Sequence, residues 1–584
     1  MRHRPAARRL VGTLLLALAA GCADRPPGIR VVGLESAPCE SGGAVLFGTV
    51  PVRVVADGDG TFSVVRLSAN EGPPQETTTA PFVIDLDTTA LPDGTARLVV
   101  EGVSGDGTVS TTLEVCVDNV PPAVTLLQPA ADTTSYVEDA ELPIRVHVTD
   151  TVGVVVVSAR LDSDLLHQEV ECTPPAGPDA VCSLSPVALG LALAPAATVR
   201  PTITVLARDL AGHETTVQRT VTFATRLLWD FDPQASAVSW SVTPLGDGTV
   251  AVGTDSGRVI VVSGAGAEVR RWTTPGADPV TTPLTLAGGR LYFGTDRNLL
   301  CLSAATLTPC WATPPAGVFL ASQPVFSAAA NAILVGRYGE AATPATLSAY
   351  NPGTGALLGT FAITTAANEG ATAPPALSAD GRTAYIGSTE SQLLAVNVSA
   401  PAAMARLWSY DATAKIDTLP LVLADRVYVA GFDGYLHAVV AAAGTRATGF
   451  SFMREYPFTA SVVAAADGNT LYAANLDEFL YALDLTGAEL GSYRIGRTLY
   501  TSPAVGPGGL VYAACTVGAG PAYGPGRLHA LAPRLDRLHW AFEPAGSVEF
   551  RASPVVMDVG GRSIVVIGNT NGHVYGLDAT PPAG

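Results

Sequence analysis

Three histidines are the residues of this chain whose type and spacing first suggest a reactive or metal-binding centre. His437, His529 and His573 stand at related places in three repeating segments. Neutral imidazoles bind transition metals and transfer protons near neutral pH, so three converging histidines could hold a metal ion. Repeats arranged around a ring direct equivalent residues to different places, however. We therefore expect these histidines to occupy surface or inter-repeat polar positions.

Other catalytic motifs are missing from the sequence. It contains no H-E-x-x-H, no G-x-S-x-G and no P-loop. The segments Asp57-Gly58-Asp59-Gly60-Thr61 and Asp106-Gly107-Thr108 resemble parts of calcium loops, but an EF-hand loop needs another ligand two residues after Asp59 and a closing glutamate. We interpret both segments as hairpin turns. The sequence thus predicts no catalytic residue, no cofactor-binding residue, no metal ligand and no cofactor.

One segment leaves calcium binding open as an alternative. Asp118-Asn119-Val120-Pro121 resembles, in shortened form, the linkers between cadherin domains. In that family, carboxylates from two domains converge on a calcium ion. The resemblance implies a calcium ion at this linker, and this is the alternative to the prediction that the chain binds no metal.

Length, composition and charge limit the class of protein. The chain has 584 residues, which is too long for one ordinary domain. Of these residues 48% are hydrophobic and 15% are charged, a composition that excludes intrinsic disorder. The formal net charge is −18. Such a field repels nucleic acid and acidic lipid headgroups, so we expect neither as a partner.

The N-terminus has the pattern of an export signal. Within residues 1–21, four arginines precede an apolar run that is too short to span a bilayer stably. The run ends in Leu18-Ala19-Ala20-Gly21-Cys22, which resembles the lipobox of bacterial lipoproteins. The resemblance implies a lipid on Cys22, a tether over residues 22–28 and, since no aspartate follows Cys22, an anchor in the outer membrane. The alternative is ordinary cleavage after Ala17-Leu18-Ala19, with Cys22 incidental.

Export changes how the eight cysteines are interpreted, because an oxidising compartment permits disulfides. With Cys22 lipidated, the simplest pairs are Cys39 with Cys116, Cys172 with Cys182, and Cys301 with Cys310, although sequence alone does not fix the connectivity. Each pair falls within one predicted domain. Cys515 is left over, and we expect it to be a small buried residue. No cysteine spacing matches a zinc site.

The elements that would position these residues are strands. After residue 28 the chain consists of short alternating runs of Val, Thr, Leu and Tyr broken by Gly, Asp, Asn and Pro, which predicts an all-β protein. The prolines of the segment 118–122 favour a boundary between two β-sandwiches, at residues 29–120 and 121–224. Val148-Thr149-Asp150 and the phrase at 207–213 resemble bacterial immunoglobulin-like domains. Such domains form stalks in surface proteins, and the resemblance implies two acidic Ig-like spacers.

A repeat fills the remaining residues, 225–580. A large aromatic residue recurs at intervals of 39 to 50 residues, at Trp229, Trp272, Trp311, Phe361, Trp408, Phe452, Tyr493 and Trp540. This period is typical of propeller blades, in which an aromatic at a fixed place fills the gap between neighbouring blades. Eight copies predict eight blades.

The repeat also has a recognisable sequence. Thr501-Ser502-Pro503-Ala504-Val505, Ser553-Pro554-Val555-Val556 and the phrases at 428–438 and 471–484 resemble the PQQ-type propeller repeat. One branch of that family, the quinoprotein dehydrogenases, holds pyrroloquinoline quinone against a disulfide between adjacent cysteines. The other consists of cofactor-free scaffolds, including the lipoprotein propeller of the outer-membrane β-barrel assembly machinery. No two cysteines are adjacent in this chain and the repeats lack long insertions, so we predict that it is not an enzyme.

These patterns together predict a non-enzymatic envelope lipoprotein whose propeller binds envelope or surface proteins. Its contact with the membrane would be through the lipid anchor only, and its oligomeric state stays open. A partner could add a strand to an outer sheet edge or lay a peptide across the axial opening. The alternative is a binder of glycans or other extracellular ligands, which should expose a row of aromatics such as Tyr456, Phe458, Tyr500 and Phe550. A PQQ-dependent dehydrogenase is the less favoured third hypothesis.

Overall fold

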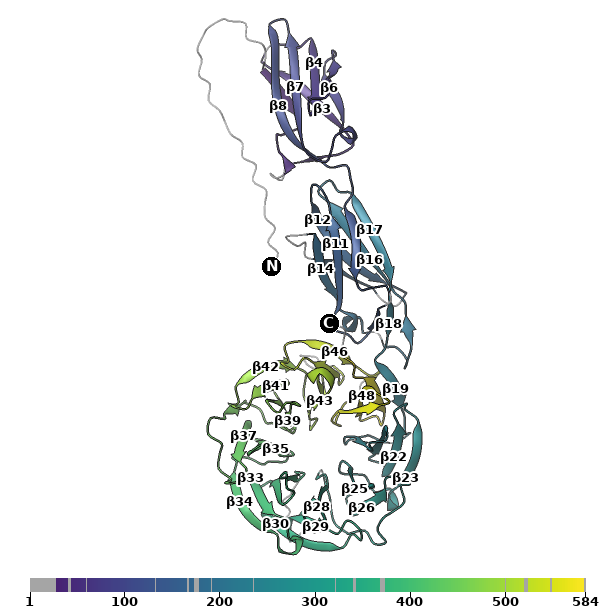
Figure 1. The fold of residues 1–584 in the computed structure, drawn as a ribbon, viewed down its shortest axis with the longest axis vertical. Coiled ribbons are helices and arrows are strands. Elements are labelled where there is room, and N and C mark those ends of the chain that lie inside the picture. Colours follow the sequence, from purple (N-terminus) through teal and green to yellow (C-terminus); the bar gives the residue numbers. More distant parts are fainter. Residues whose placement is uncertain are drawn as a thin grey trace.

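The computed structural model consists of two β-sandwiches followed by a ring of sheets (Figure 1). It describes residues 28–39, 44–58, 60–131, 133–164, 167–172, 178–190, 192–234, 236–320, 322–339, 343–367, 373–498, 500–518, 524–546 and 549–581. The predicted signal peptide, Cys22 and most of the tether lie outside these residues. Within them, helix is limited to the short 3-10 turns Thr88–Ala90, Pro186–Leu189, Pro275–Ala277, Pro401–Ala403 and Pro507–Gly509. Among the described residues, no helix has the length and apolar character that crossing a bilayer requires.

The first sandwich packs a three-stranded sheet on a five-stranded sheet. Alternate residues of the strands, such as Val52 and Val54, are buried and form one core between the sheets, as expected for half-buried strands. A disulfide joins Cys39 to Cys116 and ties the N-terminal segment to the second sheet. The sheets are β1(Gly28–Val32)-β3(Thr49–Asp57)-β6(Phe82–Asp87) and β2(Val45–Leu46)-β8(Gly107–Val117)-β7(Gly94–Ser104)-β4(Val64–Ala69)-β5(Gln75–Thr77).

The second sandwich is built in the same manner around the fully buried Ile144, Ile203 and Phe223. A disulfide between Cys172 and Cys182 joins its two main sheets. These are β14(Asp179–Leu184)-β11(Leu142–Thr149)-β9(Ala123–Gln128) and β13(His167–Cys172)-β12(Val154–Asp162)-β16(Thr202–Asp209)-β17(Glu214–Thr220). A small sheet at the end nearest the ring consists of β10(Thr134–Tyr136)-β18(Thr222–Ala224)-β15(Thr198–Val199).

The ring is a β-propeller. Between Leu227 and Asp578 the described residues form eight antiparallel sheets, whose first strands contact one another around the axis. Seven sheets follow the chain from the inside outward: β20(Thr243–Pro244), β21(Thr249–Gly253), β22(Arg258–Ser263), β23(Glu268–Thr273); β24(Thr285–Ala287), β25(Arg290–Gly294), β26(Leu299–Ser303); β27(Val325–Ser327), β28(Ala332–Arg337), β29(Pro344–Tyr350), β30(Leu357–Ala367); β31(Ala376–Leu377), β32(Thr383–Gly387), β33(Gln392–Asn397), β34(Ala405–Asp411); β35(Leu421–Leu423), β36(Arg426–Ala430), β37(Tyr435–Val440), β38(Phe452–Met453); β39(Val463–Ala464), β40(Thr470–Ala474), β41(Phe479–Asp484), β42(Glu489–Arg494); β43(Ala504–Val505), β44(Val511–Ala514), β45(Leu528–Leu531), β46(Leu538–Phe542).

The last sheet closes the ring. Its outer strand β19(Leu227–Phe231) comes from the beginning of the propeller, whereas β47(Val555–Val559), β48(Arg562–Gly568) and β49(Val574–Asp578) come from its end. Strands β19 and β49 pair antiparallel. The two ends of the propeller are therefore held in one sheet, and the chain passes from the second sandwich into the ring through β19.

The predicted aromatics occupy the outer layer of the ring. Seven of them lie in outermost strands, in β19, β23, β30, β34, β38, β42 and β46, and isolated bridges hold the segment of Trp311 beside β26. Cys301 in β26 forms a disulfide with Cys310 in that segment.

Three of the tryptophans pack on a glycine in a turn of the following sheet. A Cβ atom on Gly266, Gly355 or Gly444 would lie 2.4, 2.8 or 2.6 Å from Trp229, Trp311 or Trp408, respectively. Each indole Nε1 also donates a hydrogen bond to a carbonyl of that following sheet, on Gly264 (2.9 Å), Pro352 (3.1 Å) and Ala441 (2.9 Å). The tryptophans thus fill the seams between neighbouring sheets, and only a glycine leaves them room.

Serine side chains link the inner strands of successive sheets. A backbone N–H just before one inner strand donates to a serine hydroxyl just before the next, in the pairs Leu419 to Ser461, Ser461 to Ser502, Ser502 to Ser553 and Ser553 to Ser241, at 2.9, 3.0, 2.9 and 3.2 Å. Ser-Pro phrases recur in the sequence at two of these places, Ser502 and Ser553. Each serine hydroxyl thus accepts a hydrogen bond from a backbone N–H of the neighbouring sheet. Proline interrupts strand pairing at these places, so that N–H has no partner in a strand.

Candidate functional site

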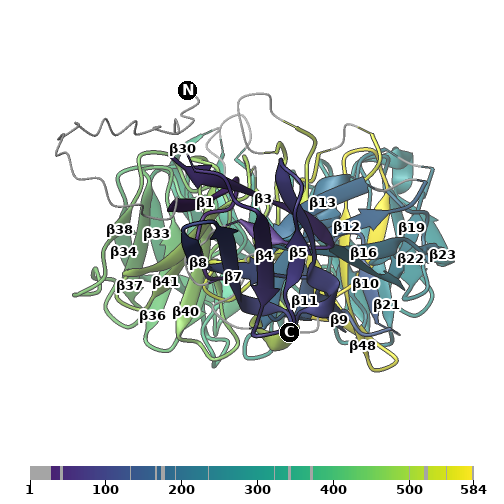
Figure 2. The ribbon, with the colours of Figure 1, turned by 90° about the horizontal axis from the view of Figure 1, so that it is seen from above.

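The second sandwich joins the propeller by adding a short strand to it. Ala140 N donates to His539 O at 2.8 Å and Ala541 N donates to Glu138 O at 3.0 Å, so the segment around Asp139 pairs with the outer edge of β46. Figures 1 and 2 show that the sandwiches leave the ring at its rim and extend away from it in the plane of the ring. The outer edge of β46, one place where the sequence suggested that a partner could add a strand, is occupied by the chain itself.

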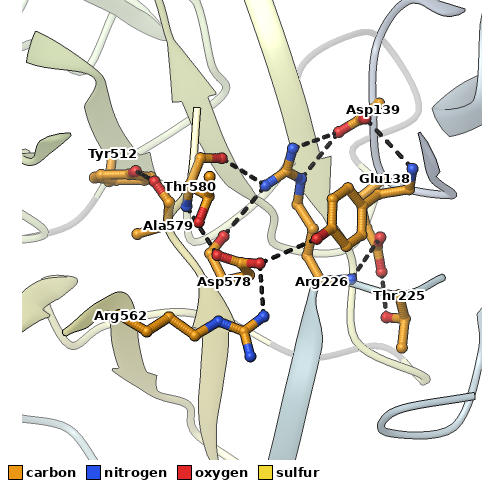
Figure 3. Close-up of polar contacts among 10 residues, drawn as sticks. Glu138, Asp139, Thr225, Arg226, Tyr512, Arg562, Asp578, Ala579 and Thr580 are labelled. Carbon is orange, nitrogen blue, oxygen red and sulfur yellow. Dashed lines mark hydrogen bonds and ion pairs between the residues drawn. The ribbon is translucent and has the colours of Figure 1, made fainter. Parts of the chain in front are cut away.

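A buried arginine is at the centre of this joint (Figure 3). Arg226 has an exposed fraction of 0%, and its Nε donates to Asp139 Oδ1 at 2.9 Å. Its Nη1 donates to Thr580 O at 2.9 Å, and its backbone N–H donates to Glu138 Oε2 at 2.9 Å. The guanidinium also lies over the Tyr136 ring at 4.3 Å. One cation therefore connects carboxylates of the second sandwich to the last residues of the propeller.

Burial disfavours the charged forms of the two carboxylates from the sandwich. It raises the pKa of Asp139, an effect that the charge of Arg226 partly opposes. Burial likewise raises the pKa of Glu138, and hydrogen bonds from Thr225 and from Arg226 N oppose it. Both carboxylates therefore depend on the groups around Arg226 to stay ionised.

Asp578 extends the network on the propeller side. Burial would raise its pKa, but hydrogen bonds from Arg562, at 2.6 Å, and from Thr580 outweigh that effect and lower the pKa to about 2. The oxygen that accepts from Arg562, Oδ2, also accepts a hydrogen bond from the Tyr136 hydroxyl at 3.1 Å. The joint is thus a connected set of charged groups rather than a flexible linker.

A cleft with a volume of about 620 Å³ lies beside this joint. Both bodies line it, and we call it the junction cleft: Val137, Glu138, Val187, Gly190, Ala192, Leu193, Ala194 and Pro195 of the second sandwich, and Leu227, Asp230, Arg527, Ala541, Phe542, Glu543, Pro544, Ala545, Gly546, Asn571, His573 and Tyr575 of the propeller. Its walls combine apolar side chains with the hydrogen-bonded pair Asp230–His573 (2.6 Å) and the ion pair Arg527–Glu543 (2.5 Å). Such a lining is typical of a binding site.

The closing strand β19 borders the cleft with one open edge. It is the outermost strand of its sheet, and Leu227 and Asp230 contribute to the lining. At its first residue, Leu227 O accepts a hydrogen bond from Ala196 N at 3.3 Å, and among the described residues no further strand pairs with its outer side. An extended chain laid in the cleft can therefore reach unpaired backbone groups of β19.

One polar pair of the cleft resembles part of a catalytic site. Asp230 holds one ring nitrogen of His573, which resembles the orienting half of a catalytic triad. Nucleophilic catalysis also needs an activated hydroxyl, thiol or amine beside the imidazole. Among the described residues that line the cleft there is no Ser, Thr, Cys or Lys, and the hydroxyl of Tyr575 accepts a hydrogen bond from Asn569 Nδ2 at 3.1 Å.

The three recurring histidines do not come together. His437 lies between Asp433, at 3.0 Å, and the Tyr410 hydroxyl, at 3.0 Å, in two neighbouring sheets. His529 packs against Tyr493 of the neighbouring sheet, whereas His573 pairs with Asp230 in the cleft. Each ring thus has its own partners. The described positions fit the expectation of inter-repeat polar residues better than that of a shared metal site.

His529 gives a prediction for the effect of pH on stability. Burial, and then the charge of Arg527, lower its pKa from 6.5 to about 4. Since the unfolded state takes up the proton first, the contribution is fully present above about pH 6.5 and is lost as the pH falls through about 4, a loss of about 3 kcal/mol. We expect His529→Gln to remove this part of the pH dependence of propeller unfolding, measured with urea between pH 7 and pH 3.5.

The matched control is His167→Gln, because His167 is exposed in the second sandwich. It should leave the pH dependence of propeller unfolding unchanged. Equal slopes for His529→Gln and the unmodified chain would contradict the assignment.

The aromatics considered for glycan binding divide into two classes. Tyr456 and Tyr500 are 51% and 56% exposed, whereas Phe458 and Phe550 are fully buried. Tyr456 and Tyr500 lie in the connections from β38 to β39 and from β42 to β43, on the same face of the ring. The expected row of four aromatics is therefore not formed, and two exposed tyrosines remain.

Cys515, the unpaired cysteine, is buried, and burial raises the pKa of its thiol to about 11.

Comparison with known proteins agrees with the ring. A family model described as outer membrane protein assembly factor BamB matches residues 214–448 and 343–502. The chain thus carries a PQQ-like repeat in its propeller.

Two solved structures are similar to the chain. The crystal structure of BamB from Moraxella catarrhalis is 18% identical, covers 60% of this chain and 97% of that chain, and has a TM-score of 0.47. The computationally designed Ika8 protein is 14% identical, covers 59% of this chain and 98% of that chain, and has a TM-score of 0.46. No curated protein matches the chain.

Proposed function

We propose that this protein is a non-enzymatic scaffold of the cell envelope that holds an extended segment of another envelope protein in the junction cleft. The observation that carries the proposal is the open edge of β19 along the junction cleft. Backbone pairing at a sheet edge supplies affinity, and pockets for alternate side chains supply selectivity. The description of the matching family, a protein assembly factor, also favours a protein partner.

The proposal includes an arrangement of the whole chain. Residues 1–21 would be removed as a signal peptide, and Cys22 would carry a lipid in the outer membrane. The sandwiches at 29–120 and 121–224 would be Ig-like spacers, and residues 225–580 an eight-bladed propeller with one blade for each sheet. Support comes from the two-sheet construction of both sandwiches and from one recurring aromatic in each sheet of the ring.

Site-specific photo-crosslinking tests this function. Ala545 is exposed at the cleft, so a photoreactive residue there should capture a reproducible envelope protein in intact cells, through one extended segment of that partner. The same group at Tyr456, which lies outside the cleft, should capture much less. Ala545→Arg should reduce the amount of partner that copurifies by at least tenfold, whereas the matched Ala442→Arg, in an exposed turn between β37 and β38, should not. Strong capture at Tyr456 and none at Ala545 would overturn the assignment to the cleft.

The exposure of Tyr456 and Tyr500 supports a second candidate, binding of a glycan on that face of the ring. Tyrosine rings bind the apolar faces of sugars by stacking. If this candidate holds, Tyr456→Ala and Tyr500→Ala will abolish binding on a polysaccharide array, and Ala545→Arg will leave it intact.

A further inference from the structure

Three side chains that can bind a metal converge where the first sandwich meets the second. The possible ligand atoms of Asp118, Asp209 and His213 all lie within 4.8 Å of one another, and the described residues contain no other such group of three. Asp118 directly follows β8 of the first sandwich, whereas Asp209 ends β16 and His213 precedes β17 of the second. The cluster therefore spans two bodies.

The buried carboxylate of Asp118 has no hydrogen-bond donor among the described residues. Its exposed fraction is 0%, and no described protein group donates a hydrogen bond to either of its carboxylate oxygens. The carboxylates of Asp150, Asp209 and Asp93 lie nearby and carry charge of the same sign. A buried carboxylate among like charges is costly unless a cation or hydrogen bonds compensate it.

The surrounding chain holds the cluster in place from the second sandwich. Asp209 Oδ1 accepts hydrogen bonds from Gly212 N and His213 N, both at 2.8 Å, and its Oδ2 lies 3.0 Å from His213 Nδ1. Asp150 Oδ1 accepts from Val152 N at 2.9 Å and from Gly153 N at 2.7 Å. Two turns thus fix the direction of the Asp150 and Asp209 carboxylates before any ligand binds.

The first sandwich holds the residues next to Asp118 equally firmly. Asn119 N donates to Asp93 Oδ1 at 2.8 Å, and Asn119 Oδ1 accepts from Thr88 Oγ1 at 2.8 Å and from Gly48 N at 3.1 Å. The residue that follows Asp118 is therefore fixed to the first sandwich.

We propose that Asp118 and Asp209 bind one calcium ion between the two sandwiches. Two oxygens that share a calcium ion at about 2.4 Å each lie no more than about 4.8 Å apart, which matches the cluster. Carboxylate oxygens suit a hard cation, and Asp150 and Asp93 add negative charge. His213 orients Asp209. The ion neutralises the carboxylates and fixes the angle between the two sandwiches. This role is separate from the binding of a partner in the junction cleft.

Calcium titration of the full chain tests the proposal. We expect calorimetry after chelator treatment to show one site per chain. Asp118→Asn should abolish it, and Asp209→Asn should weaken it at least tenfold, because asparagine keeps the shape and the acceptor oxygen but not the charge. The matched control Asp85→Asn, at an exposed carboxylate of the first sandwich, should bind calcium as the unmodified chain does.

Thermal unfolding keeps the test decisive if a variant is poorly folded. Calcium should raise the melting temperature of the unmodified chain and leave that of Asp118→Asn unchanged. In chelator, Asp118→Asn should melt no lower than the unmodified chain, since it removes an unpaired buried charge. Three results would overturn the proposal: no calcium binding by the unmodified chain, undiminished binding by Asp118→Asn, or tighter binding of zinc than of calcium.

Discussion

Replacement of Arg226 by methionine will release the second sandwich from the propeller and lower the free energy of unfolding by about 3–5 kcal/mol. Methionine fills a similar volume and keeps the backbone N–H that donates to Glu138, but it leaves Asp139 buried without its cation and removes the donor to Thr580 O. Denaturant unfolding measures the loss of stability. Small-angle scattering should show a wider range of orientations of the sandwiches relative to the ring.

Arg537→Met is the control for this prediction. Arg537 forms an ion pair with Glu141 at 3.0 Å across the same joint, but both side chains are 51% exposed. Solvent screens an exposed pair, so its loss should change the free energy of unfolding by no more than about 1 kcal/mol. Equal effects of the two substitutions would show that burial of Arg226 contributes nothing to the joint.

Trp408→Ala is expected to destabilise the propeller by about 3–5 kcal/mol. The substitution empties the seam between two sheets and removes the hydrogen bond from the indole Nε1 to Ala441 O. Gly444→Ala disrupts the same contact from the neighbouring sheet. Its Cβ would lie 2.6 Å from the Trp408 ring, and the residue has a φ of +68°, which disfavours alanine. We expect both substitutions to lower the denaturant midpoint of the propeller transition.

Leu407 gives a matched control within the same strand. It precedes Trp408 in β34 and is 54% exposed. Leu407→Ala should therefore change the free energy of unfolding by less than about 0.5 kcal/mol. If Leu407→Ala and Trp408→Ala had similar effects, the tryptophan would not act as filler between the sheets.

The all-β class and the propeller could be predicted because their signals are local and repeated. Alternating apolar residues specify strands, and a repeat with one large aromatic specifies sheets that stack on their neighbours. The partner of each aromatic was harder to predict. Gly266, Gly355 and Gly444 belong to ordinary turns in the sequence, and only the geometry of the ring shows that they lie under a tryptophan.

The candidate site could not be predicted, because its residues are far apart in the chain. Arg226 contacts Asp139, 87 positions away, and Asp578 O, 352 positions away. In the sequence Arg226 stands two positions after the predicted end of the second sandwich, and no local pattern distinguishes it. Phe458 and Tyr456 show the same limit, since two aromatics in one connection differ completely in exposure. Convergence of Asp118 with Asp209 depends on how two sandwiches meet, which no local pattern encodes.

The position of the closing strand has a mechanical consequence. The spacer continues directly into β19, which pairs with β49 from the opposite end of the propeller. If the protein is tethered at its N-terminus and its partner is pulled, the force acts along β19 and loads its hydrogen bonds to β49 together, in shear, instead of opening them one at a time. The Arg226 network carries part of the same load, because it binds the spacer to the residues that follow β49. The connection between the second sandwich and the propeller is thus loaded in the direction in which paired strands resist tension.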